Sequence, residues 1–247
     1  MTRPAMALLP TLALVLALLS LAEPAIAQEL TFSLDDTGAL SARSVQLILL
    51  ITVLSLAPGI VVMITCFPFL VTVLSILRQA LGLQTAPPNM LIVSLALFLT
   101  WFVMDPVFTA AWQAGIAPLV DGSIGVETAF VQAMEPFRGF MANRVDSTTL
   151  DAMAALRPEP PDGPAREMPL SVLVPSFLLS EIARAFQIGF LVFLPFLIID
   201  LVVAAILMSM GMMMVPPAIV SLPFKLAFFV VADGWSLIAG SLVRSYM

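Results

Sequence analysis

The sequence predicts an all-α membrane protein built from two long, kinked helical hairpins with a small helical insert between them. Hydrophobic residues make up 61% of the 247 residues and charged residues only 11%, and the mean hydropathy is +1.09. These values lie far outside the range of an ordinary soluble domain. The apolar residues form long runs that prolines interrupt, so we expect about four kinked hydrophobic spans.

The first 27 residues have the order of a secretory signal peptide. Arg3 precedes an apolar run over residues 12–21, and Ala25 to Ala27 form a small-residue cleavage site. We predict cleavage after residue 27, which leaves a polar lead over residues 28–43 outside the cytoplasmic membrane. An uncleaved anchor helix is the alternative.

The first hydrophobic hairpin is predicted over residues 44–113. Its first apolar run, residues 45–77, exceeds the roughly 20 residues that a helix needs to span a bilayer, and Pro58 and Pro68 are expected to bend it. A polar turn leads to the second apolar run, residues 90–112, which Asp105–Pro106 interrupts.

Residues 114–169 are polar and charged, which predicts a solvated helical insert on the extracytoplasmic side. Asp146, Ser147, Thr148 and Thr149 offer N-cap residues for a short helix that runs to Leu156, and the proline-rich residues 158–169 predict a loop. Four apolar residues recur at helical spacing and should dock on a neighbouring element. They are Phe130, Met134, Phe137 and Met141.

The second hydrophobic hairpin is predicted over residues 170–247, with a methionine-rich loop at its tip. Gly211 on one side and Pro216–Pro217 on the other predict a chain reversal. Methionine is unbranched and polarizable, so a cluster suits a compliant seal, although single methionines more often fill gaps between packed helices. Three in a row cannot share one helix face. The cluster is Met208, Met210, Met212, Met213 and Met214.

Seven ionisable residues lie in or beside the apolar runs: Arg78, Asp105, Glu181, Arg184, Asp200, Lys225 and Asp233. A proton relay is one interpretation, and pairing between helices or subunits is the one we favour. Glu181 and Arg184 are spaced to meet on one helix face. Lys225 is the nearby base for Glu181 or Asp200. These four residues are therefore predicted to be assembly contacts.

Composition also limits the chemistry. The chain has no histidine and one cysteine, Cys66, which leaves no basis for a structural zinc site, a histidine-bound haem or an internal disulfide, and no cofactor is predicted. No basic run marks a nucleic-acid-binding surface. An intramembrane aspartyl protease would use two of Asp105, Asp200 and Asp233, but its glycine-rich pattern is missing. A small-solute secondary transporter remains the better alternative.

Two long segments run from Pro175 to Phe190 and from Pro195 to Pro217, and shorter ones run from Arg78 to Gly82 and from Leu222 to Leu226. Together they resemble the signatures of the FliP family of flagellar type III export-gate proteins. The resemblance covers nearly all of the predicted mature chain. One departure is that Pro68 and Phe69 stand where the family usually has a Thr-Arg pair.

The resemblance implies a function in protein export, without catalysis. Several copies would assemble with FliQ and FliR into a helical gate in the inner membrane at the flagellar basal body, next to FlhA and FlhB, and unfolded flagellar proteins would pass through its centre. By motif match, Met212, Met213 and Met214, with Met210, would form the gasket of the pore. The related injectisome export gate is the alternative, but the signal peptide and the insert look more like the flagellar branch.

Overall fold

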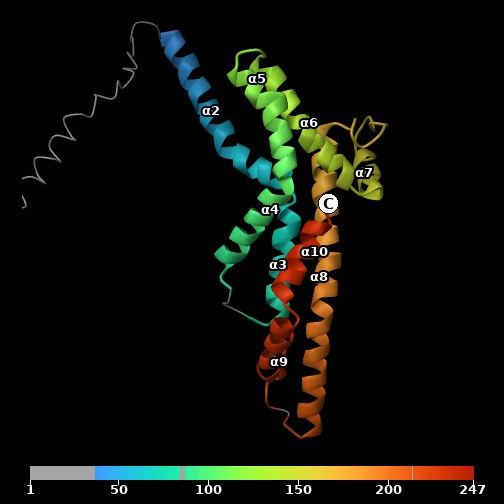
Figure 1. The fold of residues 1–247 in the computed structure, drawn as a ribbon. Helices are drawn as coiled ribbons and strands as arrows, with labels where there is room; N and C mark the ends of the chain where they lie inside the picture. Colours follow the sequence, from blue (N-terminus) through green and yellow to red (C-terminus); the bar gives the residue numbers. More distant parts are fainter. Residues whose placement is uncertain (1–36, 84–86, 213) are drawn as a thin grey trace, which may run out of the picture. The chain divides into compact units, whose positions relative to one another are not determined.

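The structure is a computed structural model that describes residues 37–83, 87–212 and 214–247 (Figure 1). Helices dominate this part of the chain and no strand occurs in it, which confirms the all-helical prediction. The predicted signal peptide, residues 28–36 of the polar lead and Met213 lie outside the described residues. The chain divides into two compact units, residues 1–53 and 54–247.

Helix α2, Thr37–Met63, begins in the first unit and ends in the second. It continues through Pro58, where the sequence predicted a bend. Along the part in the first unit, Val45, Ile48 and Leu49 are about 65% exposed, so this apolar helix leaves much of its surface uncovered.

The short helix α3, Phe67–Ala80, is the core of the second unit. The non-helical residues 64–66 separate α2 from α3. Pro68 lies in the first turn of α3, where its missing N–H costs no hydrogen bond. The predicted bend at Pro68 is therefore a helix start. One face of α3 is completely buried and packs against α4 and α8. Its buried side chains are Phe69, Leu70, Val73, Leu74, Leu77 and Ala80.

A second apolar stretch consists of α4 (Asn89–Ala111), the π-helical turn η1 (Trp112–Ile116) and α5 (Ala117–Val120). Pro106 lies inside α4 without ending it. At Gly115 a Cβ atom would stand 2.4 Å from the Ala129 backbone oxygen, so the close approach of η1 to α6 requires glycine.

The insert contains α6 (Val126–Arg144) and α7 (Ser147–Ala154). Of the four apolar residues that the spacing placed on one docking face, Phe137 and Met141 are buried and Met134 is partly buried against the core, but Phe130 is 65% exposed. The prediction is wrong for Phe130 because α6 approaches η1 at this level through the small residues Ala129 and Ala133.

Asp146, one of the four candidate N-cap residues, caps α7, although the helix ends two residues before Leu156. Its carboxylate accepts hydrogen bonds from the Thr149 backbone N–H at 2.9 Å and from the Thr149 hydroxyl at 3.0 Å. These bonds stabilise the ionised form and lower the pKa of Asp146 below its usual value. Proline-rich residues then form the loop between α7 and α8, as predicted.

The second hairpin has one very long arm and one broken arm. Helix α8, Leu170–Ser209, is 40 residues long and reverses at the methionine-rich turn into α9, Pro217–Val231. A bend of 61° separates α9 from α10, Gly234–Arg244. Asp233 adopts a left-handed conformation at the bend, and a Cβ on Gly234 would collide with the Phe229 ring.

Within the described residues, two helical stretches are long and apolar enough to span a membrane, Asn89–Val120 and Leu170–Ser209. The bent pair α9 and α10 could form a third span. The four-span count therefore remains a prediction. Both stretches leave large apolar side chains exposed, among them Phe98, Trp101, Phe190, Leu191 and Leu201.

Candidate functional site

The turn between α8 and α9 has a defined backbone geometry. Gly211 takes φ = +76°, its N–H donates to the Met208 carbonyl at 3.1 Å, and the Met212 N–H donates to the Leu207 carbonyl at 3.0 Å. This pair of bonds is a Schellman motif, which ends a helix at a left-handed residue that is usually glycine. Pro216 and Pro217 then start α9. The predicted reversal is confirmed.

The methionines at this turn point into open space within the single chain. The exposed fraction is 61% for Met208, 65% for Met210, 38% for Met212 and 97% for Met214. Met213 lies outside the described residues. Ordinary gap-filling methionines would be buried. These four residues, Met208, Met210, Met212 and Met214, form an exposed apolar tip, which we call the methionine tip, and within the described residues they leave much of their surface uncovered.

Further along α8 and α9, Lys225 joins three helices. Its ammonium lies 2.6 Å from the Asp200 carboxylate on α8 and donates to the Ala80 carbonyl at the end of α3 at 3.1 Å. Lys225 is 5% exposed, and the Ser221 hydroxyl donates to the other Asp200 oxygen. The pair is thus held within one chain, and the cation also faces the negative end of the α3 dipole.

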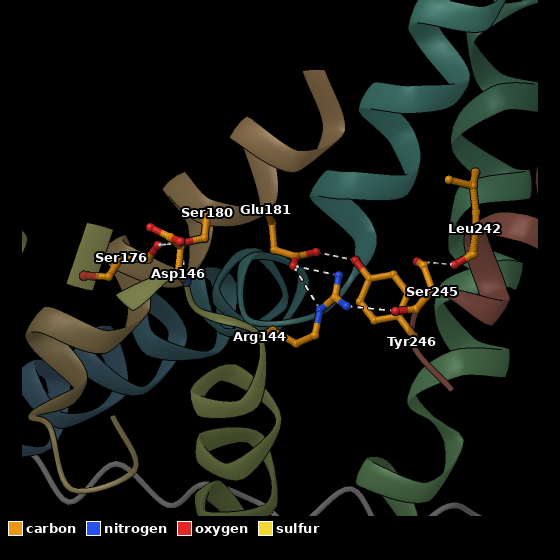
Figure 2. Close-up of polar contacts among 8 residues, drawn as sticks. All are labelled: Arg144, Asp146, Ser176, Ser180, Glu181, Leu242, Ser245 and Tyr246. Atoms are coloured by element: carbon orange, nitrogen blue, oxygen red, sulfur yellow. Dashed lines mark hydrogen bonds and ion pairs between the residues drawn. The ribbon is translucent and has the colours of Figure 1, made fainter. Parts of the chain in front are cut away.

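The second buried charge is Glu181 on α8, which is completely excluded from solvent. Its Oε1 accepts a hydrogen bond from Arg144 Nε at 3.2 Å, and Arg144 Nη2 lies at the same distance as an ion pair (Figure 2). Its Oε2 accepts a hydrogen bond from the Tyr246 hydroxyl. Arg144 also donates to the Ser245 carbonyl at 2.8 Å. These contacts connect the end of α6, the middle of α8 and the C-terminus.

Tyr246 anchors the C-terminus through its ring as well as its hydroxyl. The Arg144 guanidinium lies 4.1 Å from the ring centroid, Phe140 stacks on the ring at 6.1 Å, and Phe69 meets it edge-on at 5.4 Å. Phe69 is one of the two residues that depart from the family pattern, and here it is fully buried as part of this aromatic cluster. A charged side chain at position 69 would need a counter-charge in this fully buried site.

The structure pairs the predicted charges only in part as their spacing suggested. Glu181 is paired with Arg144 and not with Arg184, because the buried stripe of α8 runs through Phe177, Glu181 and Ala185 and leaves Arg184 half-buried at its edge. Sequence reasoning missed Arg144 and Tyr246 as its partners. A usable signal was that Tyr246 is the single tyrosine in the sequence.

The two buried ion pairs, Glu181 with Arg144 and Lys225 with Asp200, are separate from each other. Among the described residues, no three histidine, cysteine, aspartate or glutamate side chains are grouped to hold a metal ion.

Beside the methionine tip, α8 and α9 enclose a wholly apolar groove of about 410 Å³. Its lining residues are Ile198, Ile199, Val202, Val203, Ile206, Leu207, Val220 and Phe224.

Comparison with known proteins gives a consistent result. A sequence model described as the FliP family matches residues 50–242. The flagellar biosynthetic protein FliP of Caulobacter vibrioides is 55% identical over 211 residues, which cover 85% of this chain and 79% of that protein. The protein of the same name from Bacillus subtilis is 46% identical over 216 residues, covering 87% and 97%. That of Agrobacterium fabrum is 45% identical over 240 residues, covering 96% and 98%.

Proposed function

The chain belongs to the FliP family, and from that premise we propose that it is a core subunit of the flagellar type III protein export gate. In this proposal it forms the membrane channel together with FliQ and FliR, beside FlhB and FlhA, and unfolded flagellar proteins pass through. The relatives described above are all named as flagellar proteins, which supports the flagellar gate over the injectisome gate.

The observation that carries the mechanism is the exposed methionine tip. A seal around a moving, unfolded chain must accept side chains of every size and then close again. Flexible, polarizable thioether side chains can do this better than branched ones. The Schellman turn at Gly211 holds the tip at the end of two helices, so the backbone is fixed while the side chains stay adaptable. We propose that Met210, Met212, Met213 and Met214 form the gasket.

The buried ion pairs suit a subunit that must keep its fold while a substrate protein passes through the gate. Lys225 with Asp200 fixes α9 against α8 and α3, and Glu181 with Arg144 fixes the insert against α8. In the proposed gate these pairs hold the surfaces that contact neighbouring subunits in register. Arg184 is the remaining predicted assembly charge; it forms no ion pair within the described residues, and in this proposal it acts between copies.

We further propose that the gate resides in the inner membrane at the flagellar basal body. Residues 1–27 would be removed as a signal peptide, and the insert over residues 114–169 with the mature N-terminus would then face the periplasm. The exposed apolar side chains of α4 and α8 would contact neighbouring subunits or lipid, because exposure of so large an apolar surface to water is unfavourable.

The test compares sealing and export in a motile bacterium that lacks its own copy of the gene. A variant with Met210, Met212 and Met214 all changed to alanine should still assemble but should leak small ions, because the bulk that fills the pore is gone. Changing the same three residues to leucine keeps the apolar volume and should leak less. Met90→Ala, an 81% exposed methionine far along the sequence, is the position control.

Ion leakage is read as loss of membrane potential in growing cells, and export as the amount of a flagellar protein in the medium. Equal membrane potential in the triple-alanine variant and in Met90→Ala would contradict the gasket. Failure of the unaltered chain to restore export would contradict the function itself.

A further inference from the structure

Within the described residues, Asp105 on α4 and Arg184 on α8 are among the charged residues of the apolar helices that form no ion pair. We propose that they pair between copies of this chain, the Asp105 carboxylate of one copy with the Arg184 guanidinium of the next. This inference rests on the proposed function, which requires several copies side by side. It adds which residues form the contact between copies, and that the contact joins two different surfaces of the chain.

Asp105 lies on the exposed face of α4, in the middle of a stretch that is apolar enough to span a membrane. Its neighbours Trp101 and Phe102 are 63% and 60% exposed. No base lies within ion-pair distance of it in the part of the chain that the structure describes. A carboxylate on an apolar face is costly in a bilayer, so such groups normally face protein and find a partner.

Arg184 is in the complementary situation on α8. It is half-buried, and Phe186 and Phe190 on the same helix are 60% and 62% exposed. Its charge contributes to the field around the exposed Asp146 carboxylate, which Thr149 already holds, but no ion pair with Arg184 occurs in the described ranges. A guanidinium is the preferred cation for a desolvated carboxylate because it offers two donors in one plane.

The two charges belong to helices that both pack against α3. α3 packs against α4 on one side and against α8 on the other, and Figure 1 shows α3 between them. A contact that joins the α4 edge of one copy to the α8 edge of the next is head-to-tail, and repetition of such a contact gives a ring or a helical assembly. A two-fold dimer would instead bring Asp105 against Asp105 or Arg184 against Arg184.

Two acids of α8 do not compete for Arg184, since Glu181 is paired with Arg144 and Asp200 with Lys225. Neighbouring copies can therefore neutralise both charges at once.

The test uses cysteine cross-linking in membranes that contain the full chain and its co-expressed gate partners. Two differently tagged copies are produced together, one with Asp105→Cys and the other with Arg184→Cys, and are treated with a short bis-maleimide that suits the distance across an ion pair. Cys66 is completely buried and is the single native cysteine, so the unaltered chain provides the background. Asp121→Cys, at an exposed acid of the insert, replaces Asp105→Cys in the matched control.

We expect a cross-linked product with both tags at least about tenfold more abundant than in the control. Charge reversal gives the second readout: Asp105→Arg alone and Arg184→Asp alone should each reduce the oligomer about tenfold, because like charges then face each other, and the double reversal should restore it. An intact oligomer that neither cross-links nor responds to reversal would overturn this inference while leaving the export function standing. Absence of any oligomer of the unaltered chain would overturn both.

Discussion

Replacement of Arg144 by methionine is the substitution for which the structure predicts the largest loss of stability. Methionine keeps much of the side-chain volume but removes the cation, so Glu181 stays in a site with no solvent exposure and without its counter-charge. Breaking a buried pair in this way costs about 3–5 kcal/mol. The upper part of that range applies here, because water cannot reach the carboxylate and the bond to the Ser245 carbonyl is lost as well.

Two further variants give the comparison a rank order. Tyr246→Phe removes one hydrogen bond to a charged group and should cost about 1.5–3 kcal/mol. The double variant Arg144→Met with Glu181→Met removes both charges and should recover at least half of the loss, because an apolar pair of similar volume is often tolerated. Arg166→Met is the control, since its pair with Glu135 is exposed and worth at most about 1 kcal/mol.

The assay is thermal unfolding of the full chain in detergent, followed by the fluorescence of its three tryptophans. A loss of 3–5 kcal/mol corresponds to a drop in Tm of roughly 6–20 °C for a chain of this size. The expected order of destabilisation is Arg144→Met, then Tyr246→Phe, then Arg166→Met. A Tm for Arg144→Met equal to that of Arg166→Met would refute the reasoning, as would a double variant no more stable than the single one.

Three other predictions follow from single contacts. Lys225→Met should destabilise the chain by about 2–3 kcal/mol, less than a fully buried pair because the Asp200 side chain is 31% exposed, and Asp200→Asn in the same chain should restore part of the Tm. Gly211→Ala should cost about 1–2 kcal/mol because φ is +76°, whereas Gly139→Ala, inside α6 where a Cβ would meet nothing closer than 3.9 Å, should not lower Tm. The pKa of Asp146 is lower in the folded chain than in the unfolded chain, so its capping bond stabilises the helix above the unfolded pKa of about 3.9 and is lost as pH falls through the lower native pKa. The amide-exchange protection of Thr149 should therefore decrease over that pH range. In Asp146→Asn, which has no carboxylate to protonate, this protection should not change with pH.

The features that sequence could predict are those that local chemistry decides. Long apolar runs specify helices of membrane-spanning length whatever their partners are. Gly211 and Pro216–Pro217 specify a helix end and a helix start, and the chain reverses there. One of the four candidate caps, Asp146, caps α7, because the cap needs only a hydrogen bond from the backbone N–H of Thr149, three positions later.

The features that sequence missed depend on residues far apart in the chain. Glu181 had a suitably spaced base in Arg184, but its partner is Arg144, 37 residues away, because tertiary packing determines which face of α8 is buried. The bend at Asp233 depends on the Phe229 ring, which fills the space where Gly234 has no side chain. Phe130 has the periodicity of a buried residue, but the close contact of α6 with Gly115 uses a different face.

The most direct test of the central claim is cryo-electron microscopy of the chain co-expressed with FliQ and FliR. The account predicts an assembly of several copies in which the methionine tips converge on one central axis and close it. A monomer or dimer with a polar cavity at mid-membrane, or an assembly with the methionine tips turned outward to lipid, would contradict it.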